Sequence, residues 1–283
     1  MTGAALPSPI DRLAERYRTD GARAVCRLTG RHLADRYRDE RARLRWKWAK
    51  QVAREPIAEP SLIRIDPNDV DHVLAHYPSG VDGHYPLGVF GGPWDRDRTR
   101  IDALAVYRAL HVHFGQDVPW VETDGYRRAR RRIENGGTGW KGAETVAELD
   151  ERCAETDRLY ESIRDEGYRS QADLDAAVRA GETVPSHGTS TQDPRVPDEL
   201  KLAIGRNGVP IRAAGGKHRL AIARLLDCEA IPAAVIVRHS RWEAIRAEVA
   251  TANSLEGLSD RARIHLDHPD LRELVPGSWV NGR

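Results

Sequence analysis

A strand, a two-glycine turn and a helix are predicted in one continuous stretch, residues 209–226, which constrains the fold more than any other part of the chain. Apolar residues alternate with other residues over positions 209–213, the period of a strand. From position 220 to 226 they recur at the spacing of one helix face. Gly215 and Gly216 lie between the two patterns, so the chain turns directly from the strand into the helix.

The five residues from Gly215 to Arg219 have the composition of an anion site. A glycine pair leaves no Cβ to block a ligand, and the first amides of a helix have no acceptor inside it. Lys217, His218 and Arg219 place cations at the end of a helix that favours anions. A bound phosphate would offset their repulsion. The alternative is an ordinary strand–turn–helix connection whose basic side chains are solvated.

The lysine at position 217 is itself informative. Only five of the 44 lysines and arginines are lysines, namely Lys47, Lys50, Lys141, Lys201 and Lys217. Lysine is a compact point charge suited to phosphate, whereas arginine is a planar fork. No acidic residue lies within four positions of residues 217–219 on either side. We therefore expect a phosphate group at this turn.

Composition indicates a globular chain of 283 residues, with 40% hydrophobic and 31% charged residues and a net charge of only +1. The charge is uneven, because residues 10–54 hold 14 lysines and arginines against 6 acidic residues. The three cysteines, Cys26, Cys153 and Cys228, have neither a disulfide-framework nor a zinc-site spacing, and no metal site is predicted.

Residues 1–55 are predicted to form a basic helical arm, in which Trp46 and Trp48 are interleaved with cations. Such a segment suits an anionic membrane surface, a protein partner or a nucleic-acid backbone. The alternative is that Leu44, Trp48 and Val52 pack on the body and leave the cations in solvent. We expect a cytoplasmic protein, either free or peripheral at a membrane, since no signal peptide or membrane span is visible.

The remaining patterns predict a small mixed sheet with flanking helices. The expected strands are 62–65, 87–90, 200–204, 209–213 and 231–237, with an Asn-Gly turn between the third and fourth. The expected helices are 101–114, 126–133, 145–166, 171–178, the helix after Gly216, 242–252 with Ser240 as its N-cap, and one that opens at Asp66-Pro67 and includes His72 and His76. Residues 181–197 are predicted to be a mobile loop, and the last thirty residues are expected to be peripheral.

Three of these segments together resemble the ParB/sulfiredoxin superfamily: residues 62–67, 160–171 and 211–237. The sequence Gly215-Gly-Lys-His-Arg219 is similar to the Gly-Gly-Cys-His-Arg loop of sulfiredoxins, and the resemblance covers about 60–77 and 156–238. It implies an α/β (α+β) domain at 56–240 with a large helical insert at about 93–155. The arm would precede this domain, and a C-terminal helix and tail, 241–283, would follow it.

The resemblance also implies a ligand. Related proteins hold nucleotide phosphates in this loop, so Gly215, Gly216, Lys217, His218 and Arg219 are expected to bind ATP, ADP or CTP together with Mg²⁺. Ser162 and Gln171 would line the facing wall, and Glu161 and His218 are the candidate catalytic residues. The protein would then be a phosphotransferase or an NTP hydrolase. The alternatives are a non-enzymatic, nucleotide-dependent module that engages DNA, a membrane surface or a protein through its arm, and a fold that has kept no ligand.

Two departures from the family narrow these functions. Lys217 occupies the position of the sulfiredoxin nucleophilic cysteine, so reduction of sulfinic acids is not expected. Only 43 residues follow position 240, too few for both the helix-turn-helix and the dimerisation region of ParB partition proteins. The sequence therefore predicts a nucleotide site whose reaction is unassigned.

Overall fold

The computed structural model describes residues 60–75, 87–184 and 196–280, together with three exposed helical positions, Tyr37, Glu40 and Leu44. The rest of the predicted arm, His76 and most of the 181–197 loop lie outside the described residues.

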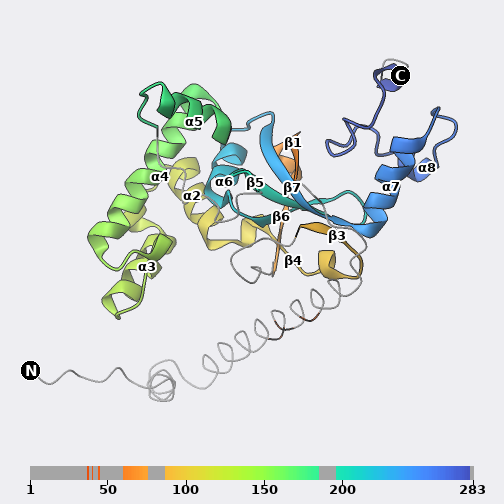
Figure 1. Ribbon diagram of the computed structural model, residues 1–283. Helices are drawn as coiled ribbons and strands as arrows, with labels where there is room; N and C mark the ends of the chain where they lie inside the picture. Colours follow the sequence, from red (N-terminus) through yellow and green to blue (C-terminus); the bar gives the residue numbers. More distant parts are fainter. Residues whose placement is uncertain are drawn as a thin grey trace, which may run out of the picture.

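Seven strands in the described ranges form one mixed sheet at the centre of the molecule (Figure 1). The strands are β1 (Ser61–Ile65), β2 (His72–Leu74), β3 (Gly88–Phe90), β4 (Arg98–Arg100), β5 (Leu200–Ile204), β6 (Pro210–Ala214) and β7 (Ile231–His239). Their order is β1-β7-β5-β6-β2-β4, and β3 also pairs with β7. The mixed α/β class expected from the sequence is thus confirmed.

Strand β7 pairs with more strands of this sheet than any other strand that the structure describes. It pairs antiparallel with β1 and parallel with both β5 and β3. Its residues are almost all buried, as its uniformly apolar run predicts. Strands β5 and β6 form the predicted antiparallel hairpin, with Ala203 opposite Ile211. This hairpin carries the chain from the centre of the sheet into the two-glycine turn.

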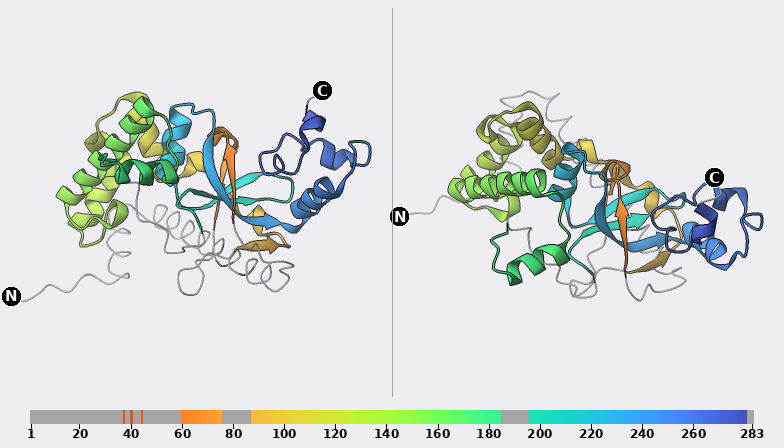
Figure 2. Two further views of the ribbon diagram at one scale, coloured as in Figure 1. Left: turned by 45° about the horizontal axis from the view of Figure 1, so that its top comes forward. Right: turned by 90° about the horizontal axis from the view of Figure 1, so that it is seen from above.

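Helices flank the sheet at its two ends (Figures 1 and 2). The α-helices are α2 (Ala105–Gln116), α3 (Asp124–Glu134), α4 (Val146–Glu166), α5 (Gln171–Arg179), α6 (Lys217–Leu225), α7 (Ser240–Thr251), α8 (Asp260–Arg263) and α9 (Gly277–Val280). Short 3-10 turns are η1 (Pro67–Asp69), η3 (Trp94–Arg96), η4 (Ile101–Ala103), η5 (Trp120–Glu122) and η6 (Trp140–Gly142). Helix α6 joins the two parts, because its Ala221 packs into the core of α2, α3 and α4 while Leu220 packs into the core of the sheet.

The prediction of a helix that begins at Asp66-Pro67 is wrong. Asp66 does cap a turn, its side chain accepting from Asn68 N at 2.7 Å, but this turn is only η1. The chain then extends into β2, which pairs with both β6 and β4. Pairing on both edges of β2 outweighs the local helix-start signal, and it places His72 on a strand.

The last thirty residues are not peripheral, contrary to the sequence-based expectation. Leu258, Ala262, Leu266 and Leu271 are buried in the core that includes β7 and α7. The N-cap of α7 is also His239, whose side chain accepts from Arg241 N, rather than Ser240.

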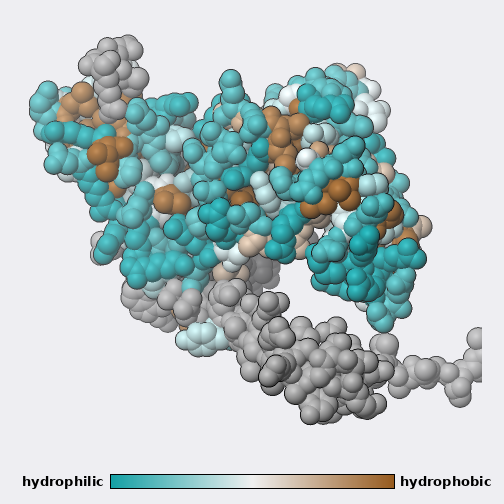
Figure 3. All heavy atoms as spheres, turned by 180° about the vertical axis from the view of Figure 1, so that it is seen from behind, coloured by the Kyte–Doolittle hydropathy of each residue, from teal (hydrophilic) through white to brown (hydrophobic). Residues whose placement is uncertain are grey.

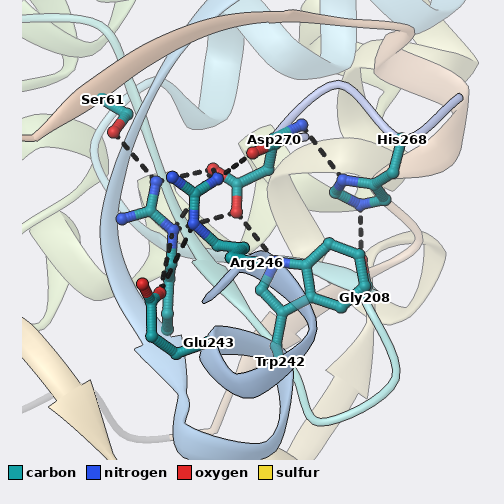
Figure 4. Close-up of polar contacts among 8 residues, drawn as sticks. Ser61, Gly208, Trp242, Glu243, Arg246, His268 and Asp270 are labelled. Atoms are coloured by element: carbon teal, nitrogen blue, oxygen red, sulfur yellow. Dashed lines mark hydrogen bonds and ion pairs between the residues drawn. The ribbon is translucent and has the colours of Figure 1, made fainter. Parts of the chain in front are cut away.

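A buried ion network ties this C-terminal segment to the sheet (Figure 4). The Asp270 carboxylate accepts from Arg238 Nε at 2.9 Å and Nη2 at 2.6 Å, and from Trp242 Nε1 at 2.8 Å. Arg246 Nη1 lies 3.2 Å from the same carboxylate. Nearby, His268 Nε2 lies 2.8 Å from the carbonyl oxygen of Gly208, in the β5–β6 turn. These contacts make residues 260–271 part of the folded body.

Candidate functional site

The turn between β6 and α6 requires both of its glycines. Gly215 and Gly216 have φ angles of 59° and 57°, in the left-handed region that favours glycine. A Cβ on Gly216 would lie 3.2 Å from Leu200 Cα, and one on Gly215 would lie 3.1 Å from Lys201 Nζ. The turn therefore lies directly against the start of β5, and its backbone approaches that strand as only glycine allows.

Helix α6 begins immediately after the turn and has no side-chain cap. Leu220 N donates to Gly216 O at 2.8 Å, the first intrahelical bond. The amides of residues 217–219 precede that bond and so have no acceptor inside the helix. Gly215–Arg219 thus combines a glycine turn with an uncapped helix start, as the sequence predicts.

Cationic groups from several elements gather at this turn. Burial first, and then the charges of Lys217, Lys141 and Arg212, lower the pKa of His218 to about 3. Partial burial, followed by the charges of Arg212 and Lys141, also lowers the pKa of Lys217, although Lys217 is exposed as a whole residue. His218 is therefore neutral in the ligand-free protein at physiological pH. Arg212 supports the turn by donating from Nε to Gly215 O at 2.8 Å.

Three of the chain's five lysines lie around this turn, each from a different element. Lys217 opens α6, Lys201 lies on β5 beneath Gly215, and Lys141 comes from η6. Lys201 is fully buried, and its Nζ donates to Glu199 O at 3.1 Å. Lys141 has a positive φ of 48° and lies 3.2 Å from Glu155 Oε2. The scarcity of lysine in the sequence was therefore a usable signal for Lys141 and Lys201, not only for Lys217.

Arg219 is directed away from the turn and into the protein. It is 5% exposed, and its Nη2 donates to Arg169 O at 2.7 Å. Its guanidinium lies over the ring of Tyr168, 4.5 Å from the centroid, and its Nη1 lies 3.5 Å from Glu199 Oε2. These contacts fasten the first turn of α6 to the segment between α4 and α5. The part of Arg219 that faces the helix start is its backbone amide.

The predicted facing wall is only partly brought to the turn. Gln171 N donates to Glu199 Oε1 at 2.5 Å, so the start of α5 is linked through Glu199 to Arg219. Glu161 and Ser162 lie on α4, where Glu161 is exposed. No hydrogen bond or ion pair in the described part of the chain joins either of them to residues 215–219.

Glu199 is the acidic residue that the sequence did not single out. It is 5% exposed, its Oε2 makes no hydrogen bond, and burial raises the pKa of its carboxyl. Its position on the strand side of Arg219 follows from the pairing of β5 with β6 and β7. No local sequence pattern carries that information.

An open pocket of about 370 Å³ lies at the opposite end of β5 and β6. It is lined by Asp95, Arg96, Arg98, Gly205, Arg206, Asn207 and Val209. Arg206 Nη2 is 2.5 Å from Asp95 Oδ1, so the main cation and anion of the pocket neutralise each other. We centre the candidate site on the glycine turn, because its left-handed glycines and uncapped helix start leave backbone amides free for an anion.

Over the described ranges, no group of three or more histidine, cysteine or acidic side chains is placed to hold a metal ion. In the same ranges, none of the helices has the length and apolarity needed to cross a bilayer. Comparisons with protein-family models, curated proteins and solved structures find no significant match to the chain.

Proposed function

We propose that the Gly215–Arg219 turn binds the phosphate groups of a nucleotide. The observation that carries this proposal is the uncapped start of α6 after two left-handed glycines, with Lys217 at its first position and the charges of Arg212 and Lys141 acting on it. In the described part of the chain, every charge that acts appreciably on Lys217 or His218 is positive. A phosphate would relieve this repulsion and accept hydrogen bonds from the free amides of α6.

Each group has a distinct role in this proposal. The amides of residues 217–219 bind phosphate oxygens, and Lys217 supplies a point charge. His218, neutral in the free protein, donates one ring N–H, and a phosphate beside it would raise its pKa. Arg219 holds α6 in place from within, and Arg212 holds the turn through Gly215 O.

A nucleotide, rather than a smaller phosphate, is supported by the resemblance of this loop to those of the ParB/sulfiredoxin superfamily. Such nucleotides commonly bind as Mg²⁺ complexes, but the described residues supply no cluster of metal ligands at the turn. We therefore assign no side chain to Mg²⁺. A phosphotransferase, an NTP hydrolase and a nucleotide-dependent switch all share this binding step.

Thermal unfolding of the full chain with ATP, ADP, CTP and GTP, each with Mg²⁺, tests the proposal. A ligand at 100 times its dissociation constant adds about 2.7 kcal/mol to the free energy of unfolding, and we expect a rise of roughly 5 °C or more. AMP, adenosine and pyrophosphate as further ligands separate recognition of phosphate from recognition of the base. Phosphate release from the bound nucleotide then separates an enzyme from a switch.

The matched variants are Lys217→Gln and Arg158→Gln, which both remove one exposed positive charge. Arg158 lies on α4 and pairs with Glu151 at 2.7 Å. We expect Lys217→Gln to raise the dissociation constant of the nucleotide several-fold and so to reduce the ligand-induced rise in melting temperature. Arg158→Gln should keep the wild-type rise. If no nucleotide shifts the wild-type protein, or if both variants behave alike, the proposed site is wrong.

A further inference from the structure

Helix α3 has an outer face made of arginine. Tyr126 and Ala129 are buried against the neighbouring helices, and Gly125 is buried with them. Every exposed residue of this helix is charged, and five are arginines: Arg127, Arg128, Arg130, Arg131 and Arg132. The helix lies on the side of the helical group farthest from the C-terminal helices (Figure 1).

Among the residues that the structure describes, three of these arginines have no acidic partner. Arg128 and Arg130 form surface ion pairs along the helix, with Asp124 at 3.7 Å and Glu134 at 2.8 Å. Across the described part of the chain, no ion pair is formed by Arg127, Arg131 or Arg132. Arg127 and Arg131 are four residues apart on the same face, and like charges at that spacing destabilise a helix by about 0.2–0.5 kcal/mol.

Helix stability accounts for only part of this arrangement. Cations in the last turn favour the helix dipole, which explains Arg131 and Arg132. Arg127 lies near the start of α3, where the dipole disfavours a positive charge. Arg127 is not needed to cover the apolar core either, because Tyr126 and Ala129 already fill the buried face of the helix. The unpaired charges instead suit a polyanionic partner.

We propose that the outer face of α3 binds the phosphate backbone of a double-stranded nucleic acid. Arginine forks bind phosphate oxygens in pairs, and several of them along one face can follow successive phosphates. A membrane surface fits less well, because α3 exposes no apolar side chain that could enter a bilayer. Seen from behind, the described surface at the lower right of Figure 3 is mostly hydrophilic. This surface is separate from the nucleotide turn and does not depend on it.

Fluorescence anisotropy of a labelled 20-base-pair duplex, titrated with the full chain at several salt concentrations, tests this inference. Duplex DNA and duplex RNA form two arms, and vesicles containing anionic lipid form a third. The test variant is Arg127→Gln/Arg131→Gln/Arg132→Gln. The control is Arg158→Gln/Arg164→Gln/Arg179→Gln, which removes three exposed charges from α4 and α5. Thermal unfolding of both variants checks that they remain folded.

We expect the wild-type protein to bind a duplex with an affinity that falls steeply as salt rises. Each lost phosphate contact reduces the magnitude of the negative slope of log K against log salt by about 0.9. The slope of the α3 variant should therefore be less steep than that of the wild type by roughly 2 to 3. The control should keep the wild-type slope. Equal slopes for wild type and the α3 variant would assign any binding to another part of the chain and overturn the inference. Binding to vesicles but to neither duplex would overturn it as well.

Discussion

The buried carboxylate of Asp270 links the C-terminal segment to β7 and α7. Burial alone would raise the pKa of Asp270, but the hydrogen bonds and charge of Arg238, with the charge of Arg246 and the Trp242 indole, hold it below its usual range. Both of its oxygens are used, by Arg238 and by Trp242. Removing the charge would leave the buried Arg238 with only the more distant Glu243 carboxylate, 3.8 Å from its Nε, which is more costly than losing a surface pair.

We therefore expect Asp270→Asn to lower the free energy of unfolding by about 3 kcal/mol at pH 7. Because the folded pKa is depressed, the carboxylate stabilises the protein fully above the unfolded value, 3.8, and loses this effect as pH falls through the folded pKa. The difference between wild type and variant should therefore stay constant at higher pH and shrink as pH falls below 3.8. Urea unfolding across this range measures it.

Asp260→Asn is the matched control for that measurement. Asp260 lies in the same segment, and its side chain is fully exposed at 3.8 Å from Arg263. It should change stability by less than about 0.5 kcal/mol at any of these pH values. Equal effects of the two substitutions would contradict the role assigned to Asp270.

At individual residues, the sequence predicts the character of the site better than the direction of its side chains. The glycine pair and Lys217 could be identified because their requirements are local: a left-handed turn and a compact charge. Arg219 has the same charge as Lys217, yet its guanidinium lies inward, against the ring of Tyr168 and the carbonyl oxygen of Arg169. Glu199 reaches the same place from a distant strand. Side-chain direction at this site is set by tertiary packing, which no local pattern records.

Among the elements, the β6–α6 turn is one whose geometry allows little change. Gly216 combines a left-handed backbone with a close approach to Leu200, whereas Gly136 is left-handed, with a φ of 74°, but faces open space. Alanine at either position would incur backbone strain. Only at Gly216 would it also collide with another strand.

Gly216→Ala should therefore destabilise the protein by roughly 1 kcal/mol or more beyond the loss caused by Gly136→Ala. It should also abolish the nucleotide-dependent rise in melting temperature, which Gly136→Ala should leave intact. Thermal unfolding with and without ligand gives both quantities. If the two variants lose the same stability and both keep the ligand shift, the close contact of the turn with β5 does not matter.

Most elements could be predicted because their periodicity and caps agree with the final packing. Helix α4 is capped by Thr145 and buries Leu149, Cys153 and Ile163, as its apolar spacing predicts. The helix predicted after Asp66 is wrong although Asp66 does cap a turn. The residues that follow form β2 because two other strands pair with them. Strand pairing between distant segments is what a single-sequence pattern leaves open.

At the scale of the whole molecule, the C-terminal residues complete the core of the sheet. Leu258, Leu266 and Leu271 are each less than 7% exposed. A buried leucine contributes about 1.5–3 kcal/mol by removal from water, and a domain is typically stable by only 5–15 kcal/mol. This segment has few apolar residues, so its sequence suggests a peripheral position. Most of those apolar residues nevertheless pack into or against the core.

A chain ending at Ala252 should therefore fail to fold as a stable unit. Truncation after Ala252 removes the three leucines and Asp270 together. It should therefore abolish the cooperative thermal transition measured by circular dichroism. A truncated protein that melts cooperatively near the wild-type temperature would show that residues 253–283 contribute little to the core.

The lysines around the β6–α6 turn also make the packing of the helices on the sheet sensitive to ionic strength. Lys141 belongs to the helical group, whereas Lys201 and Lys217 belong to the sheet and to α6. The repulsion between Lys141 and Lys217 therefore acts across the boundary at which Ala221 packs against the helices, and it opposes that packing. Dissolved salt screens such repulsion over about 10 Å at 0.1 M. In the absence of ligand, the fit of the helices against the sheet thus depends on the ions of the surrounding solution.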